Sequence, residues 1–487
     1  YADGVIDESR NRLICVREDH TQGDREAQNT IVAIDLRTGG EGDVLLSGAD
    51  FYSNPRLNPD GTFLCWLQWN HPNMPWDGTE LWVARVNEDG SLTNKEKIEG
   101  SERVSVFQPQ WSPTGVLYFV SDRTNWWNLY RSHRGAIETV APLEAEFAEA
   151  QWTFGVSTYA FTAPQRIICR YVQKGVWNLA WIDAASGVLH DINSPYTGID
   201  DICAKPGRAV FVAASPNQPS AIVEFDFDGN EFRVLARSTD VDIDPEYLAE
   251  PEAIEFGTGN GKTAHAFYYE PQNREFEGPR GARPPLLVIG HGGPTGATYG
   301  TLKWKIQYWT SRGIAVADVN YGGSTGYGRP YRERLNEQWG IVDRDDTTNA
   351  ARHLVDRERV DGERLAIRGG SAGGYLTLCC LTFKDVFKVG ASYYGVSDLE
   401  ILAKETHKFE SHYLDKMVGP YPEKQDRYQE RSPLHFTDRL SCPIVFFQGD
   451  EDKICPPNQT EMMGDALRKK GLPVAVIMFE GEQHGFR

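Results

Sequence analysis

The chain has 487 residues, more than one hydrophobic core ordinarily organises, so two domains are expected. Its composition, 40% hydrophobic and 24% charged, is that of a soluble globular protein. The net charge of −19 argues against a nucleic acid or an anionic membrane surface as partner, because both select clustered Lys and Arg, and no apolar run reaches the roughly 20 residues of a membrane span.

The N-terminal sequence YADGVIDESR contains neither the basic start nor the apolar core of a signal peptide. It also lacks an initiator Met, so an upstream segment that includes a targeting signal is compatible with the sequence. None of the cysteines forms a C-x-x-C pair, which argues against a zinc site or a disulfide framework. We therefore expect reduced core cysteines, a cytoplasmic or other reducing compartment, no metal and no cofactor.

Residues 1–243 are predicted to form short β-strands, because alternating apolar runs are bounded by Gly, Pro, Asn and Asp. A related unit recurs every 40–50 residues or so, which is the spacing of β-propeller blades. We place the middle strand of each unit at Leu13, Phe63, Leu117, Tyr159 and Phe211. Five blades are visible, and further blades upstream in the natural chain are compatible with the sequence. A β-sandwich is the alternative fold.

Residues 244–487 are predicted to form a second, α/β domain. Nearly continuous apolar runs alternate with helical segments at 343–358, 373–383 and 459–471. This alternation indicates a mostly parallel sheet with helices on both faces. The predicted strands lie within 285–293, 313–321, 364–371, 387–395, 443–450 and 473–481.

The stretch AIRGGSAGGYLTL at 366–378 contains G-x-S-x-G around Ser371. A strand is predicted before it and a helix after it, which is the context of a nucleophile elbow. The turn presents the serine hydroxyl at the sheet edge and accepts only small neighbours. Ser371 is therefore the candidate nucleophile.

A serine nucleophile needs a base and an orienting carboxylate, which follow it in the chain of α/β-hydrolases. His484 lies in the loop 480–486 after the last predicted strand, whereas His407 and His412 lie in a polar insertion and His435 in a loop. The spacing does not distinguish between the carboxylates of Asp450, Glu451 and Asp452, and Asp398 is a further alternative.

An oxyanion hole in such a site uses the backbone N–H after the nucleophile, here Ala372, and a second N–H from an early loop. The sequence HGGP at 291–294 follows the first strong parallel strand and supplies a glycine-rich backbone for it. His291 precedes Ser371 in the chain, which argues against it as the base.

These motifs together resemble the prolyl oligopeptidase family of serine peptidases, in its acylaminoacyl-peptidase and dipeptidyl-peptidase-like branch. The resemblance rests on the repeats followed by HGGP, NYGGSTGYG, GGSAGGY, QGDEDKICPP and EQHGF. It implies Ser371 as nucleophile, Asp452 as acid and His484 as base. It further implies Gly293 and Ala372 as oxyanion donors, assisted in some branches by Tyr327.

The resemblance also implies that the propeller admits only short or unfolded peptides. In the dipeptidyl branch, paired propeller glutamates hold the free amino terminus of the substrate. Glu144, Glu146 and Glu149 lie in this part of the chain, but we interpret them as solvated charges at a blade edge. Relatives commonly carry Arg where Gly322 stands, so a substrate contact from that Arg is in doubt here.

The function expected from the sequence is hydrolysis of short peptides through a Ser-Asp-His triad and an acyl-enzyme. A carboxylesterase with the same triad and a non-catalytic propeller scaffold with a relic hydrolase domain are the alternatives. A homo-oligomer is compatible with the family. The sequence leaves open the residue preference at the cleavage site and the requirement for a free or blocked amino terminus.

Overall fold

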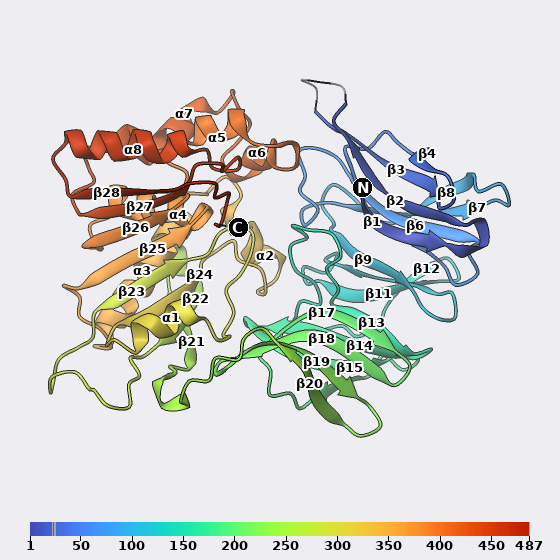
Figure 1. The fold of residues 1–487 in the computed structure, drawn as a ribbon, viewed down its shortest axis with the longest axis horizontal. Helices are drawn as coiled ribbons and strands as arrows, with labels where there is room; N and C mark the ends of the chain where they lie inside the picture. Colours follow the sequence, from blue (N-terminus) through green and yellow to red (C-terminus); the bar gives the residue numbers. More distant parts are fainter. Residues whose placement is uncertain (22, 24–25, 487) are drawn as a thin grey trace. The chain divides into compact units, whose positions relative to one another are not determined.

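A computed structural model describes residues 1–21, 23 and 26–486 (Figure 1). By its internal packing the chain divides into two compact units. Unit 1 comprises 1–213, 220–238 and 326–329, and unit 2 comprises 214–219, 239–325 and 330–487. The extents of the natural domains, 1–243 and 244–487, stay a prediction.

Unit 1 contains five four-stranded antiparallel sheets in chain order, as expected for propeller-like blades. The first two sheets are β1 (Ala2–Asp7), β2 (Arg12–Asp19), β3 (Gln28–Asp35), β4 (Gly39–Leu46), and β5 (Phe51–Leu57), β6 (Phe63–Trp69), β7 (Glu80–Val86), β8 (Leu92–Gly100). The other three are β9 (Val106–Trp111), β10 (Leu117–Ser121), β11 (Asn128–His133), β12 (Ala136–Thr139); β13 (Tyr159–Ala163), β14 (Arg166–Gln173), β15 (Val176–Asp183), β16 (Leu189–Ile192); and β17 (Gly198–Lys205), β18 (Arg208–Ser215), β19 (Gln218–Asp226), β20 (Glu231–Arg237).

The repeat register predicted from the sequence is wrong in the fourth sheet. Leu13, Phe63, Leu117 and Phe211 lie in the second strand of their sheets, but Tyr159 begins the first strand, β13. The strands β13 and β14 are both short apolar runs, separated by a two-residue turn. Pattern alone therefore does not distinguish between them, and the second strand of this sheet begins at Arg166.

Neighbouring sheets share buried side chains. Ile14 and Val16 of the first sheet pack with Leu64 and Trp66 of the second. Gln108 of β9 links the third sheet to the fourth, because its Oε1 accepts from Thr158 N at 2.7 Å and its Nε2 donates to Tyr159 O at 2.8 Å. Each sheet thus completes its core against the next, as repeat architectures require.

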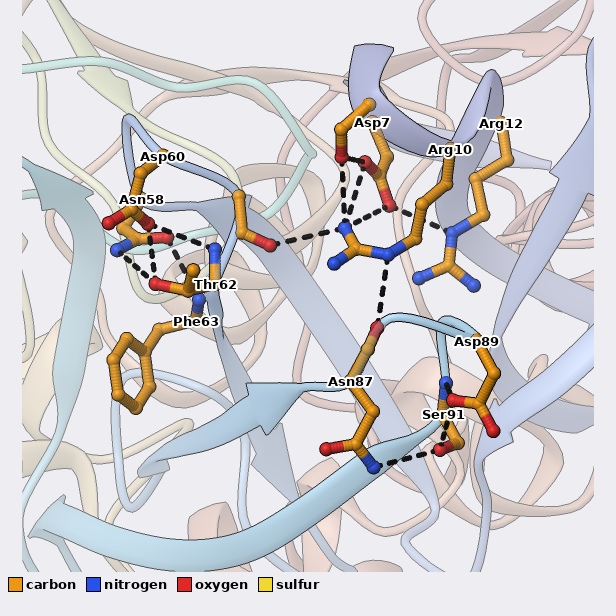
Figure 2. A network of polar contacts seen from close by, with 12 residues as sticks. Asp7, Arg10, Arg12, Asn58, Asp60, Thr62, Phe63, Asn87, Asp89 and Ser91 are labelled. Carbon is orange, nitrogen blue, oxygen red and sulfur yellow. Dashed lines mark hydrogen bonds and ion pairs between the residues drawn. The ribbon is translucent and has the colours of Figure 1, made fainter.

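A polar network ties the first sheet to the second (Figure 2). The buried Asp7 carboxylate, next to the short 3₁₀ helix η1 (Glu8–Arg10), accepts hydrogen bonds from Arg10 and Arg12. Arg10 also donates to the carbonyl oxygens of Gly61, at 3.2 Å, and Asn87, at 3.1 Å. Burial would raise the pKa of Asp7, but the hydrogen bonds from Ser9, Arg12 and Arg10 hold it below its usual range.

Unit 2 is built on one eight-stranded sheet with the order β21-β22-β24-β23-β25-β26-β27-β28. The strands are β21 (Pro251–Gly257), β22 (Thr263–Tyr269), β23 (Leu286–Gly290), β24 (Ala315–Asn320), β25 (Leu365–Gly370), β26 (Val389–Tyr393), β27 (Ile444–Gly449) and β28 (Val474–Phe479). The helices are α1 (Trp304–Thr310), α2 (Arg329–Arg332), α3 (Val342–Asp356), α4 (Ala372–Phe383), α5 (Leu399–Glu405), α6 (Tyr413–Met417), α7 (Gln425–Glu430) and α8 (Pro457–Lys469). Short 3₁₀ helices are η2 (Pro245–Tyr247), η3 (Gly259–Gly261), η4 (Glu333–Leu335), η5 (Lys408–Glu410) and η6 (Pro433–Phe436).

The six strands predicted in this half of the chain are confirmed as the parallel part of the sheet, β23 to β28. The sequence did not identify β21 and β22, which add an antiparallel edge. Leu287 and Ile289 of β23 pack against Ile306 of α1, so the alternate residue Val288 faces the other side of the sheet. Parallel strands end at one edge, and the loops after β25, β26, β27 and β28 therefore meet there.

All eight cysteines are free. Seven are buried, which agrees with the expected core role, but Cys203 is exposed, so that expectation is wrong for this residue.

In the described part of the chain, no helix combines the length and apolar character needed to cross a membrane.

Candidate active site

Ser371 lies on the sharp turn between β25 and α4. Its φ of 56° and ψ of −123° are in a region that side-chain-bearing residues rarely adopt. Its backbone N–H donates to Tyr393 O at 3.0 Å, and its carbonyl accepts from Gly374 N at 2.9 Å. The strand before, the helix after and the strained serine together form the elbow that the sequence predicts.

Two glycines allow the close approach that this turn needs. A β-carbon on Gly369 would lie 2.8 Å from the Cα of Gly373, and one on Gly373 would lie 3.1 Å from the carbonyl oxygen of His291. The chain therefore tolerates a hydrogen atom but little more at both positions, since backbone atoms cannot move aside as a flexible side chain can.

Asp452 and His484 form a direct pair. The Oδ2 of Asp452 lies 2.8 Å from Nδ1 of His484. Asp452 follows β27 and is 3% exposed, whereas His484 follows β28 and its side chain is 20% exposed. Because the carboxylate accepts, the imidazole proton facing it is on Nδ1, which leaves Nε2 to exchange a proton with another group.

Further hydrogen bonds fix the Asp452 carboxylate. Its Oδ1 accepts from the backbone N–H groups of Ile454 and Cys455, both at 2.9 Å. The Gln448 amide also donates toward Oδ2, at 3.4 Å, and its own Oε1 accepts from Thr460 at 2.9 Å. Both carboxylate oxygens are thus occupied, so the orientation of Asp452 is set before any substrate arrives.

The Tyr394 ring connects the elbow to the Asp452–His484 pair. It packs edge-on against the His484 ring with centroids 4.7 Å apart. Its hydroxyl lies where a β-carbon on Gly370 would be 2.8 Å away. Ser371 and His484 therefore both lie around Tyr394, at the edge of the sheet where the strands β25 to β28 end.

A small cavity of about 20 Å³ lies beside Ser371. Gly293 and Ala372, the two predicted oxyanion donors, line it together with Ser371. The structure thus places all three around one hollow space. Their role as a nucleophile with two donors stays a prediction.

The other candidate acids and bases pair elsewhere. Asp398 caps the N-terminus of α5 and its Oδ2 lies 3.4 Å from His435 Nε2. His407 pairs with Glu410 at 3.4 Å, and His412 with Asp415 at 2.8 Å. Asp450 accepts from Gly481 N at 2.8 Å and is exposed, as is Glu451.

His291 is the first residue of the glycine-rich loop and is partly buried. Its Nδ1 lies 2.8 Å from Gly292 O and its Nε2 2.7 Å from Ser324 Oγ, and its ring stacks on Tyr321. Burial lowers the pKa of His291 to about 4, so the ring is neutral at physiological pH. This arrangement suits a residue that positions the loop and agrees with its exclusion as the base.

Tyr327 belongs to the segment 326–329, which clusters with unit 1, and its hydroxyl lies against Gly175. Its predicted part in the oxyanion hole of unit 2 therefore stays a prediction.

The interpretation of Glu144, Glu146 and Glu149 as solvated charges is wrong for two of them. Glu146 is fully buried and accepts from Gly326 N at 2.8 Å, and Glu149 pairs with Arg170 at 2.6 Å.

Sequence reasoning did not single out Tyr394, Gln448 or Cys455. Tyr394 directly follows β26, so the same argument from strand ends that selected His484 would have found it. Cys455 lines the cavity with Ser371, and burial raises its thiol pKa, which the charges of Asp452 and Glu410 raise further. Gln448 has no sequence signal beyond its place in β27.

Comparison with known proteins agrees with these features. The model of the prolyl oligopeptidase family matches residues 300–487. The crystal structure of a puromycin hydrolase superposes with a TM-score of 0.95 and is 40% identical, over 100% of this chain and 75% of that chain. A puromycin-hydrolyzing peptidase of Mycobacterium tuberculosis has the same identity and TM-score, over 100% of this chain and 76% of the other.

The match to a curated relative is more restricted. The dipeptidyl aminopeptidase BIII of Pseudoxanthomonas mexicana is 30% identical over 242 residues. These residues make up 48% of this chain and 35% of that protein, so the match spans about a third of the relative's own length. The similarity to the two crystal structures, in contrast, extends over the whole of this chain. The chain therefore belongs to the prolyl oligopeptidase family of serine peptidases.

Proposed function

We propose that the chain hydrolyses short peptides as a serine peptidase, with Ser371 as nucleophile, His484 as general base and Asp452 as the orienting acid. The observation that carries this proposal is the 2.8 Å contact between Asp452 Oδ2 and His484 Nδ1, beside a strained serine elbow. Family membership and the cavity beside Ser371 support it.

In the proposed reaction, Nε2 of His484 takes the hydroxyl proton of Ser371 while Oγ attacks the scissile carbonyl carbon. The tetrahedral intermediate collapses as the C–N bond breaks, and His484 gives the proton to the leaving amine. Water, deprotonated by His484, then attacks the acyl-enzyme and releases the acid. Asp452 holds the imidazole in the required tautomer and stabilises its protonated form.

Gly293 and Ala372 would donate backbone N–H groups to the oxyanion, and Tyr327 is the third candidate. Such donors act where negative charge develops, and removal of one typically lowers kcat by about 10²–10³-fold. For the two backbone donors the support is their shared position on the cavity wall with Ser371.

The proposed substrates are short peptides, and the proposed role of the propeller is to exclude folded proteins. The relatives named for puromycin hydrolysis and for dipeptidyl aminopeptidase activity support an amide rather than an ester substrate. Homo-oligomer formation and a reducing compartment stay predictions.

A fluorophosphonate probe tests the nucleophile. We expect it to label the wild-type chain and not Ser371→Ala. Turnover is then compared between five-residue peptides, the same sequences inside a folded protein, and simple esters. Labelling with ester turnover alone would replace the peptidase by an esterase, and an unlabelled, folded wild-type chain would reject both enzyme functions.

A further inference from the structure

The glycine-rich loop 291–295 lies directly against the serine elbow. A β-carbon on Gly292 would be 3.5 Å from the β-carbon of Ser371. Gly293, the proposed oxyanion donor, has a φ of 120°, and a β-carbon on it would be 2.8 Å from the backbone nitrogen of Thr295. Thr295 therefore packs closely on Gly293, and the direction of the Gly293 N–H depends on where Thr295 is held.

The hydroxyl of Tyr413, the first residue of α6, holds Thr295. The Thr295 N–H donates to Tyr413 Oη at 3.1 Å, and Thr295 Oγ1 lies 2.6 Å from the same oxygen. Thr295 is 1% exposed and Tyr413 is 3% exposed, so water does not compete for these contacts. Two hydrogen bonds to one hydroxyl thus fix both the backbone and the side chain of Thr295.

Tyr413 has a support of its own, which does not depend on the glycine-rich loop. It belongs to the helical segment 399–430, which contains α5, α6 and α7 and lies between β26 and β27. The carbonyl oxygens of Lys416 and Met417 in α6 accept from the backbone N–H groups of Glu337, at 2.8 Å, and Trp339, at 3.2 Å. Tyr413 therefore acts as a fixed support for Thr295 and not as a side chain that follows the loop.

A second tyrosine holds the other end of the same loop. Tyr321, directly after β24, donates from its hydroxyl to His291 O at 3.0 Å. The loop is thus held at its first residue from the sheet and at its last residue from the helical segment. Gly293 lies between these two supports and lines the cavity beside Ser371, as Tyr413 does.

We propose that Tyr413 is a positioning residue of the oxyanion hole: its hydroxyl holds Thr295, and through Thr295 it holds the Gly293 N–H where the oxyanion develops. This inference rests on the proposed peptidase function. The oxyanion carries its full negative charge only after Ser371 has attacked. A displaced donor therefore weakens binding of the transition state much more than binding of the substrate.

Tyr413→Phe tests this role, because it removes the hydroxyl and keeps the ring. We expect kcat to fall by about 10- to 100-fold and KM to stay within about 3-fold, since a misplacement near 1 Å is enough for such a loss.

A matched pair of inhibitors supplies a readout that a merely structural role would not change. Ser371 Oγ adds to the carbonyl carbon of a peptide aldehyde, its proton passes to His484, and the former carbonyl oxygen becomes the oxyanion. The corresponding peptide alcohol forms no such bond. We expect Tyr413→Phe to weaken binding of the aldehyde by about 10- to 100-fold and binding of the alcohol by less than about 3-fold.

The matched control is Tyr428→Phe in α7 of the same helical segment. Tyr428 is fully buried and its hydroxyl donates to Gly419 O at 2.7 Å, so this variant also leaves a buried backbone group unpaired. Tyr428 does not belong to the described residues that line the cavity. We expect Tyr428→Phe to keep kcat and aldehyde binding within about 3-fold of wild type, while thermal unfolding compares the stability of the two variants.

The contact is also tested from its other side, so the result does not depend on the folding of one variant. Thr295→Ser keeps the hydroxyl and should keep kcat within about 3-fold, whereas Thr295→Val removes it and should lower kcat. The double variant Tyr413→Phe with Thr295→Val should lose no more than about 3-fold beyond Tyr413→Phe alone, because both changes remove the same contact.

The inference is overturned if Tyr413→Phe lowers kcat no more than Tyr428→Phe, or weakens the alcohol as much as the aldehyde. Fluorophosphonate labelling separates this failure from that of the proposed function. If Ser371 is labelled and peptides turn over, the peptidase stands and only the role of Tyr413 fails. If the folded wild-type chain is not labelled, the proposed function and the inference fail together.

Discussion

Asp452 and His484 contact each other across the ends of two adjacent parallel strands, with 2.8 Å between Oδ2 and Nδ1. They are 32 residues apart in the chain, and the sheet brings them together because β27 and β28 end at the same edge. The carboxylate accepts two backbone N–H groups on its other oxygen, so its position does not depend on the histidine.

We predict that Asp452→Asn lowers kcat by about 10³–10⁴-fold, because an amide in place of the carboxylate no longer fixes the Nδ1–H tautomer or stabilises the imidazolium. The measurement is peptide turnover together with the rate of fluorophosphonate labelling. The matched control is Asp450→Asn, which changes an exposed carboxylate two residues away. Equal losses in both variants would assign the effect to the loop rather than to the pair with His484.

The elbow gives a prediction about stability. In Gly369→Ala the new methyl would lie 2.8 Å from the Gly373 Cα, so the backbone around Ser371 must shift. We expect a loss of about 1–3 kcal/mol in the free energy of unfolding, the usual range for overpacking. Chemical unfolding measures it. Gly278→Ala, where a β-carbon meets nothing within 4 Å, is expected to change stability by less than about 0.5 kcal/mol.

Sequence reasoning succeeded where the signal was local. The parallel strands are continuous apolar runs, and the elbow is a five-residue motif with a strand on one side and a helix on the other. Spacing could not choose between Asp450, Glu451 and Asp452, because the choice depends on which carboxylate turns back to accept from Ile454 and Cys455.

The burial of Glu146 had no local signal. Its hydrogen-bond donor is Gly326, 180 residues away, so the sequence around Glu146 resembles any acidic blade edge. The same holds for the cavity beside Ser371, because the residues that line it come from at least five separate segments. Contacts between distant segments decide such surroundings, and the sequence pattern does not record them.

Arg170 in unit 1 gives a third prediction. Its side chain is 1% exposed, pairs with Glu149 at 2.6 Å and Asp200 at 2.7 Å, and lies 3.9 Å from the centre of the Trp177 ring. We expect Arg170→Ala to cost about 3–5 kcal/mol of stability, because two carboxylates lose a shared buried cation. Asp200→Asn should cost less than about 1 kcal/mol, since the Asp200 side chain is 54% exposed. Thermal unfolding measures the stability of both variants. Similar losses of stability in Arg170→Ala and Asp200→Asn would contradict the prediction that Arg170 stabilises both carboxylates.

Asp343 in α3 gives a prediction about pH. Its side chain is buried, and burial raises the pKa of this carboxyl to about 7, although the Gly340 N–H that donates to its Oδ1 at 2.8 Å lowers it in part. Its Oδ2 has no hydrogen-bond partner among the described residues. The folded chain therefore holds the Asp343 proton at pH values where an unfolded chain, with a pKa of about 3.9, has released it.

Because the folded state binds more protons than the unfolded state between about pH 4 and pH 7, this group makes stability fall as pH rises through that window, by at most about 1.4 kcal/mol per pH unit. Below about pH 4 and above about pH 7 the contribution of Asp343 to stability does not change with pH. In Asp343→Asn this contribution disappears, so the variant should gain about 2 kcal/mol relative to wild type between pH 5 and pH 7.5.

Hydrogen exchange of α3 peptides at pH 5, 6, 7 and 7.5, corrected for the intrinsic pH dependence of exchange, measures this difference. Asp356→Asn is the control, because Asp356 lies on the same helix and is exposed. It should leave the pH dependence of wild type in place. If the stability of Asp343→Asn fell with pH as steeply as that of the wild type, a group other than Asp343 would bind the proton. The charged neighbours Arg344 and Arg431, which interact electrostatically with Asp343, would then stabilise its ionised form more than burial disfavours it.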